Sequence, residues 1–114
     1  MTTIYGIKNC DTMKKARQWL ADHGVEARFH DYRAHGVDAG RLAGWVDRLG
    51  WEALLNRNGT TFRALPDADK QAIDRDKALA LMTASPAMIR RPVLEHGDTL
   101  EVGFKPDRYA ALFG

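Results

Sequence analysis

Residues 2–32 read TTIYGIKNCDTMKKARQWLADHGVEARFHDY, and the sequence pattern changes twice within this stretch. Thr2–Ile7 is rich in β-branched and aromatic residues, which favours a strand. In Asp11–His23 apolar residues recur at helical spacing after an Asp-Thr pair suited to capping, and Gly24 suits the C-terminal end of that helix. Within Val25–Tyr32, the run Ala27–Tyr32 predicts a second strand. A strand, a helix and a strand in this order predict a βαβ unit with parallel strands.

The middle of the chain is predicted to be helical. After Asp38, a capping residue, apolar residues recur at the spacing of one helix face as far as Gly50. Trp51–Leu55 predicts a further turn or two. Asp67–Ile73 and Lys77–Ala84 predict two more helices, separated near Asp74–Asp76.

The last quarter of the chain returns to short strands. Val93–His96 and Thr99–Val102 are strand-like runs, and Gly97-Asp98 between them suits a tight hairpin. Pro106 fits the first position of a helix, and Tyr109–Phe113 is the helix that it introduces. These elements predict a ββα unit at the C-terminal end.

The order of the elements predicts the fold class. A βαβ unit, a helical block and a ββα unit together indicate an α/β protein with a thioredoxin-like fold and an inserted helical subdomain at about residues 38–85. With 114 residues, the chain has room for one domain, which we expect to span residues 1–114.

Composition narrows the possible functions. A net charge of +2 is too small to indicate nucleic-acid binding. No stretch approaches the roughly 20 apolar residues of a membrane-spanning helix, and the N-terminal residues lack the pattern of a signal peptide. One cysteine excludes an internal disulfide and favours a reducing, cytoplasmic compartment. The four histidines show no metal-ligand spacing, so no metal site is expected.

The single cysteine, Cys10, falls at the junction of the first strand and the first helix. Unpaired N–H groups and the helix dipole favour a thiolate there, and they can lower a cysteine pKa from ~8.5 to between ~3.5 and ~7.5. Lys8, Lys14 and Lys15 act in the same direction, whereas Asp11 opposes them. The alternative interpretation is an inert cysteine that packs as a small apolar side chain. The polar turn around Cys10 favours the reactive one.

A second feature is Arg90-Arg91-Pro92, before the third predicted strand. An X-Pro bond adopts the cis form at small cost, typically in a tight turn. Two guanidinium groups beside it can bind an oxyanion or a carboxylate in bidentate fashion. Two solvated arginines before an edge strand are the alternative.

Taken together, segments spread over the whole chain resemble the arsenate reductase (ArsC)/Spx family, and most closely its YffB-type branch. The segments are Thr3–Thr12, Leu54–Gly59, Ile89–Val93 and Val102–Phe104. The resemblance implies a thioredoxin-like fold with an inserted helical subdomain. It also implies that Cys10 is a redox-active thiol, and that Arg91 precedes the family's cis-proline, Pro92, and faces that thiol.

Departures from the family pattern bear on function. Arsenate-reducing members carry a glycine and further hydroxyl groups after the cysteine, where this chain has Asp11-Thr12-Met13. Two of their three oxyanion-binding arginines fall on Asn56 and Lys105, although Arg57 takes the first position after a shift of one residue. Spx regulators commonly carry Cys-x-x-Cys, and here the second position is Met13.

The leading hypothesis is a glutathione-dependent thiol-disulfide oxidoreductase. Because no second thiol exists in the chain, another molecule must resolve any adduct on Cys10. We therefore expect no bound cofactor, glutathione as co-substrate, glutaredoxin as a further candidate partner, and a small-molecule or disulfide substrate. Besides the catalytic Cys10, the residues expected to bind substrate or glutathione are Lys8, Asn9, Arg91, Pro92, Arg57 and Lys105. The alternatives are arsenate reduction by the same thiol and a Spx-like regulator that binds the RNA polymerase α subunit. No nucleic-acid or membrane partner is expected.

Overall fold

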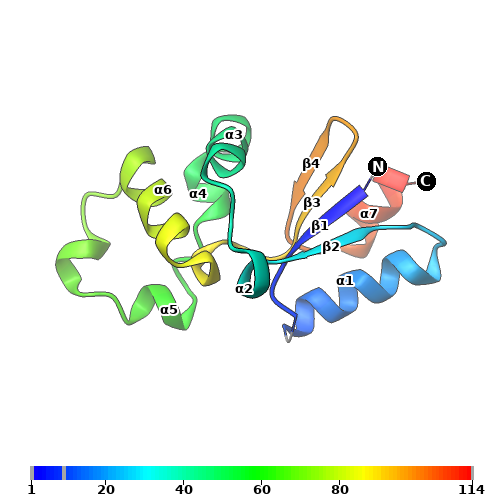
Figure 1. Cartoon of the computed structure of the whole chain (residues 1–114), viewed down its shortest axis with the longest axis horizontal. Coiled ribbons are helices and arrows are strands. Elements are labelled where there is room, and N and C mark those ends of the chain that lie inside the picture. Colours follow the sequence, from blue (N-terminus) through cyan, green and yellow to red (C-terminus); the bar gives the residue numbers. More distant parts are fainter. Residues whose placement is uncertain (1, 9, 114) are drawn as a thin grey trace. The chain divides into compact units, whose positions relative to one another are not determined.

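The computed structural model describes residues 2–8 and 10–113. They form two compact units, one made of Met1–His35 and Arg91–Gly114 and the other of Gly36–Arg90. Figure 1 shows the strands in the first unit and a set of short helices in the second. The assignment of residues 1–114 to a single domain stays a prediction. No helix within the described residues is long and apolar enough to cross a membrane.

The first unit is built on a four-stranded sheet with the order β2-β1-β3-β4. Its strands are β1 (Thr2–Gly6), β2 (Arg28–Asp31), β3 (Val93–His96) and β4 (Thr99–Val102). β1 pairs with β2 in parallel, whereas β1 with β3 and β3 with β4 are antiparallel. The helices of this unit are α1 (Asp11–Asp22), α2 (Tyr32–His35) and α7 (Pro106–Phe113). This βαβ-plus-ββα topology confirms the predicted thioredoxin-like α/β fold.

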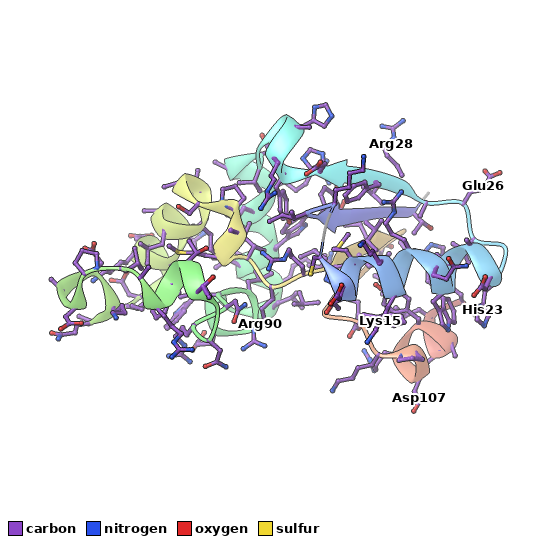
Figure 2. All side chains as sticks on the ribbon, turned by 90° about the horizontal axis from the view of Figure 1, so that it is seen from below. Lys15, His23, Glu26, Arg28, Arg90 and Asp107 are labelled. Carbon is purple, nitrogen blue, oxygen red and sulfur yellow. The ribbon has the colours of Figure 1, made fainter. Side chains whose placement is uncertain are left out.

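One face of the sheet carries the core of the first unit (Figure 1), because α1 and α7 both pack against it. The residues of this core are Ile4, Met13, Ala16, Leu20, Leu94 and Tyr109. Helical spacing in α1 and alternation in β1 and β3 bring these side chains to the same side. The opposite face of α1 is polar, and Figure 2 shows Lys15 pointing away from the core.

The second strand is shorter than predicted. Ala27 lies outside β2, because the chain leaves α1 through Gly24, at φ 70°, and the Val25 N–H still bonds to the Leu20 carbonyl at 2.9 Å. At its other end the carboxylate of Asp31 accepts a hydrogen bond from the Arg33 N–H at 2.9 Å. This contact turns the backbone, so Tyr32 begins α2 instead of ending the strand.

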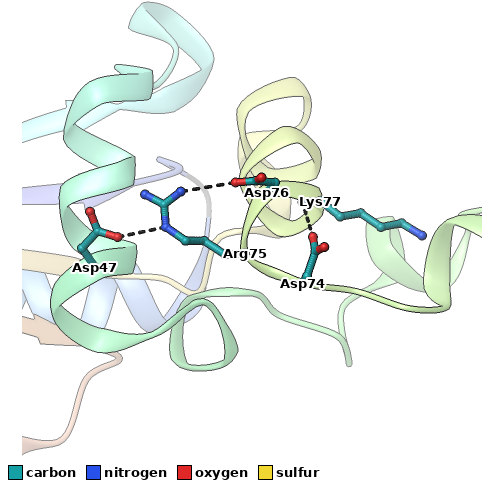
Figure 3. A network of polar contacts seen from close by, with 5 residues as sticks. All are labelled: Asp47, Asp74, Arg75, Asp76 and Lys77. Atoms are coloured by element: carbon teal, nitrogen blue, oxygen red, sulfur yellow. Dashed lines mark hydrogen bonds and ion pairs between the residues drawn. The ribbon is translucent and has the colours of Figure 1, made fainter.

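The second unit contains short helices. They are α3 (Ala39–Leu49), α4 (Trp51–Leu54), α5 (Thr60–Arg63) and α6 (Arg75–Ala84), with 3₁₀-helices η1 (Asp67–Lys70) and η2 (Pro86–Met88). Asp38 caps α3 through the Arg41 N–H, and Asp74 caps α6 through the Lys77 N–H. Arg75 links α6 to α3 by a 2.9 Å ion pair with Asp47 (Figure 3).

The predicted helix over Asp67–Ile73 is wrong, since only the 3₁₀-helix Asp67–Lys70 forms there. Lys77 explains the difference, because its ammonium group bonds to the carbonyl oxygens of Ala68 and Gln71 at 3.0 and 2.5 Å. These bonds to Lys77 compete with the hydrogen bonds that the same carbonyl groups would accept within an α-helix. Ala72 then leaves the helical region altogether, with a positive φ of 52°. The helices α2 and α5 and the 3₁₀-helix at Pro86 were not predicted.

Candidate active site

The sheet register brings three separate segments to one edge of the first unit. Gly6, the last residue of β1, pairs with Asp31, the last residue of β2. Tyr5 pairs with Val93, the first residue of β3. The turn after β1, the start of α2 and the segment before β3 therefore meet at this edge. These are the segments that carry Cys10, Tyr32 and Arg91.

A tight turn connects β1 to α1 and sets the direction of the helix. The Cys10 N–H reaches the Ile7 carbonyl at 3.4 Å, and the Lys14 N–H bonds to the Cys10 carbonyl at 3.0 Å. Met13 lies fully buried beneath Gly6, where an added Cβ would stand 2.8 Å from the Met13 Cε. Since real Cβ atoms essentially never approach so closely, a side chain at position 6 would force the buried Met13 side chain to move.

Cys10 is the N-cap residue of α1, with an extended backbone at φ −92° and ψ 131°. Its side chain is half-buried and makes no capping hydrogen bond of ordinary geometry. The sulfur nonetheless lies close enough to the N–H groups of the first turn for them to lower its pKa. A thiolate, which is a stronger acceptor than a thiol, is the form that these groups favour.

Opposing effects act on the acidity of this thiol. Burial raises the pKa of Cys10, whereas the backbone N–H of Met13, the side chain of Arg91 and the N–H of Thr12 lower it by hydrogen bonding. The positive charge of Arg91 lowers it further. The net result is a pKa below the ordinary cysteine value. The site therefore favours a nucleophilic sulfur.

Arg91 owes its place to the turn that precedes β3. The Arg91–Pro92 peptide bond is cis, as the family resemblance implies, and Pro92 is buried. The Gly103 N–H donates to the Pro92 carbonyl at 2.8 Å, with Gly103 in the left-handed region at φ 82°. This bond ties the turn to the end of β4, so the position of Arg91 depends on both strands of the hairpin.

The other predicted site residues fall into three groups. Lys8 and Lys105 are exposed residues of the first unit. Arg57 is exposed in the second unit, where its guanidinium lies 5.6 Å from the centroid of the Trp51 ring. Asn56 accepts a 3.1 Å hydrogen bond from the Asn58 N–H in the same loop. Asn9 lies outside the described residues.

Sequence reasoning missed a polar cluster that is centred on Tyr5 of β1. Tyr5 donates a hydrogen bond of 2.5 Å to the Glu95 carboxylate, and its ring lies 5.2 Å from that of His30. The ring of Tyr32 lies 5.9 Å from His30 in a T-shaped arrangement. Alternation places Tyr5 and Glu95 on the sheet face opposite Ile4 and its core, and this was the signal available in the sequence.

Among residues 2–8 and 10–113, no group of three histidine, cysteine, aspartate or glutamate side chains is arranged to hold a metal ion. Two of the histidines have other contacts: His96 bonds to the Thr2 hydroxyl at 2.7 Å, and His23 stacks on Trp19 with ring centroids 3.8 Å apart.

Comparison with known proteins agrees with this arrangement. The ArsC family model matches residues 5–112. A solved structure of the protein YffB is similar over 100% of both chains, at 54% identity and a TM-score of 0.97. An arsenate reductase (ArsC) related protein from Brucella melitensis is 55% identical, with a TM-score of 0.79, over 98% of this chain and 93% of that chain. An uncharacterised protein of Haemophilus influenzae is 42% identical over 113 residues, 99% of each chain. The chain belongs to the ArsC family.

Proposed function

We propose that this protein is a glutathione-dependent thiol-disulfide oxidoreductase. The observation that carries the proposal is the environment of Cys10: it caps α1, and the Arg91 side chain donates a hydrogen bond to its sulfur. Both features stabilise the thiolate, which is the reactive form in thiol–disulfide exchange.

The reaction proceeds in two exchanges. The Cys10 thiolate attacks the glutathione sulfur of a mixed disulfide, so a new S–S bond forms to Cys10 and the substrate leaves as a thiolate that takes up a proton. A glutathione thiolate then attacks the Cys10–glutathione disulfide, which releases oxidised glutathione and restores the Cys10 thiolate. The substrate disulfide is reduced and two glutathione units end as one disulfide. The second thiol comes from outside, because the chain has one cysteine.

Charged groups of the first unit suit an anionic co-substrate. Glutathione carries two carboxylates and one ammonium group, so it is a net anion at neutral pH. Lys8 and Lys105 are exposed, and we assign them to the attraction of these carboxylates. Arg91 is assigned to the sulfur itself, where its hydrogen bond holds the negative charge. Pro92 fixes the turn that carries Arg91. Arg57 lies in the second unit, and its part in binding stays a prediction from the sequence.

Turnover of a small mixed disulfide tests the proposal. The purified chain is mixed with reduced glutathione and the mixed disulfide of glutathione and 2-mercaptoethanol, and oxidised glutathione is measured with glutathione reductase. We expect Cys10-dependent turnover that Cys10→Ser abolishes and that the exposed-site control Arg28→Gln keeps. Equal rates for the wild type and Cys10→Ser would rule the proposal out.

Arsenate reduction is a second candidate, favoured by the hydrogen bond between Arg91 and Cys10 and by the arsenate reductase-related name of the Brucella melitensis protein. In this reaction As(V) would be reduced to As(III) by two electrons, one from the Cys10 sulfur and one from the glutathione sulfur. These two sulfurs end as a mixed disulfide, and the oxygen lost from arsenate leaves as water. Arsenite released from arsenate in the presence of glutathione and glutaredoxin, and lost in Cys10→Ser, is the expected result for this activity. Absence of Cys10-dependent arsenite would exclude it.

A further inference from the structure

The reaction above does not use one buried hydroxyl group at the edge of the sheet that carries Cys10. Tyr32, the first residue of α2, is 3% exposed. Within the described part of the chain its hydroxyl oxygen is buried and makes no hydrogen bond. Burying a hydroxyl without a partner is unfavourable, and phenylalanine would fill the same space without that cost. The presence of the hydroxyl group despite this cost points to a role toward its neighbours.

Tyr32 stands in a cluster that draws a residue from each of the three strands meeting at this edge. We call Tyr5, His30, Tyr32 and Glu95 the backing cluster. The ring of His30 lies 5.9 Å from that of Tyr32 and 5.2 Å from that of Tyr5. The Tyr5 hydroxyl in turn donates to the Glu95 carboxylate at 2.5 Å. These contacts hold the Tyr32 ring against His30 of β2, and His30 against Tyr5 of β1.

The charge of Arg91 reaches the Tyr32 hydroxyl. Burial and Tyr5 raise the pKa of the Tyr32 phenol, Arg91 lowers it and Glu95 raises it, and the balance leaves the pKa far above its ordinary value. Tyr32 is therefore a neutral phenol at neutral pH. Arg91 thus acts both on the Tyr32 phenol and on the sulfur of Cys10. The register of β1 with β2 and with β3 brings the segments that carry Tyr32, Cys10 and Arg91 to the same edge of the sheet.

We propose that Tyr32 is a positioning residue that holds the guanidinium of Arg91 against Cys10. The physical basis is twofold. A buried phenol oxygen beside a guanidinium contributes a charge–dipole attraction that the low local dielectric strengthens. A rigid ring, fixed by its own packing, also limits the rotamers of the long arginine side chain. The inference rests on the proposed function, because it requires Cys10 to react as a thiolate.

The acidity of Cys10 in single and double variants tests the inference. The rate of alkylation of Cys10 by iodoacetamide is measured against pH for the wild type, Tyr32→Phe, Arg91→Gln and Tyr32→Phe/Arg91→Gln. Tyr109→Phe is the matched control, since Tyr109 is also a buried tyrosine of the first unit whose hydroxyl makes no hydrogen bond within residues 2–8 and 10–113, and it packs against Trp19 and Phe104.

We expect Tyr32→Phe to raise the apparent pKa of Cys10 by about half a unit, a part of the 1–3 units that a neighbouring charge contributes. Tyr109→Phe should leave it unchanged. In the Arg91→Gln background the further change from Tyr32→Phe should vanish, because Tyr32 acts through Arg91. A merely structural role for the hydroxyl would not produce this dependence on Arg91.

Two results overturn the inference and leave the proposed function standing. One is a wild-type pKa for Cys10 in Tyr32→Phe. The other is a rise in the pKa of Cys10 on Tyr32→Phe that is equally large in the wild type and in Arg91→Gln. A wild-type thiol that titrates at its ordinary value, with no Cys10-dependent turnover, would instead remove the proposed function and the inference together. The two failures are therefore distinguishable in one set of measurements.

Discussion

Arg91 donates a hydrogen bond to the sulfur of Cys10, although the two residues come from opposite ends of the chain. Cys10 follows β1 and Arg91 precedes β3, and the pairing of these strands brings them together. The acidity of the thiol is therefore a property of the folded sheet and not of the local sequence around the cysteine.

Replacement of Arg91 should make the thiol less acidic. Arg91→Gln removes both the charge and the charge-assisted hydrogen bond, so we expect the pKa of Cys10 to rise by about one unit. Alkylation at neutral pH should slow by up to about tenfold, because the thiolate fraction falls. Arg90→Gln is the control, since Arg90 is the exposed neighbour and is not among the groups that lower the pKa of Cys10. Equal effects of the two variants would contradict this assignment.

The lowered pKa of Cys10 also predicts a pH dependence of stability. The folded state holds the thiolate below the ordinary thiol pKa of ~8.5, and the unfolded state does not. The thiolate therefore stabilises the fold fully above this ordinary pKa, and the stabilisation is lost as the pH falls through the lower folded-state pKa. The free energy of unfolding of the wild type relative to Cys10→Ser should rise over this window and then level off. Urea unfolding at a series of pH values measures it, and a constant difference would argue against a thiolate in the folded state.

The two exposed lysines should affect binding and not acidity. In Lys8→Gln/Lys105→Gln we expect the pKa of Cys10 to stay at the wild-type value, since Arg91 is the charge that acts on the thiol among the described residues. The KM for glutathione should rise, and the rise should shrink as salt screens the lost attraction. Steady-state kinetics at low and high ionic strength measures both effects. A changed thiol pKa with an unchanged KM would reverse the assignment.

The sequence predicted the elements whose causes are local. The position of Cys10 before α1 follows from strand composition, a capping pair and helical spacing, all within a few residues of one another. The approach of Arg91 to the thiol involves residues far apart in the chain, and only the family resemblance pointed to it. The same holds for the cis peptide bond before Pro92.

Sequence reasoning failed where side-chain hydrogen bonds override a pattern of composition. Tyr32 completes an apparent strand, but the Asp31 carboxylate binds the Arg33 N–H and begins a helix. Residues 67–73 have a helical composition, but the Lys77 ammonium group donates hydrogen bonds to two of their carbonyl groups, those of Ala68 and Gln71. Neither contact has a periodic signature, so no window of sequence reveals it.

Two aspartates of the second unit should differ in their effect on stability. Asp74 caps α6 by accepting a 2.9 Å hydrogen bond from the Lys77 N–H, and Asp47 forms an ion pair with Arg75 on the surface (Figure 3). Loss of an N-cap typically costs about 1 kcal/mol, so Asp74→Ala should lower the free energy of unfolding by this amount. Exposed ion pairs contribute little, and Asp47→Ala should leave the melting temperature nearly unchanged. Thermal unfolding of the two variants measures both effects. A larger loss of stability in Asp47→Ala than in Asp74→Ala would contradict the capping role.

The contact between Gly6 and Met13 should limit the sequence at the end of β1. An alanine Cβ at Gly6 would stand 2.8 Å from the Met13 Cε, so Gly6→Ala must displace either the methionine or the start of α1. We expect a loss of about 1–3 kcal/mol in the free energy of unfolding, as for other overpacked cores. The matched control is Gly44→Ala in α3, where nothing lies within 4 Å of the added carbon and alanine should stabilise the helix by up to about 1 kcal/mol.

A second change at Met13 tests whether crowding against this side chain causes the loss at Gly6. Met13→Ala alone leaves a cavity and should cost about 2–5 kcal/mol, because the side chain is fully buried. In Gly6→Ala/Met13→Ala the new methyl group occupies part of that space, so the combined loss should be smaller than the sum of the two. Strictly additive losses in urea unfolding would show that the methionine is not the obstacle. Since Met13 also supplies an N–H that lowers the pKa of Cys10, Gly6→Ala should raise that pKa if it displaces α1.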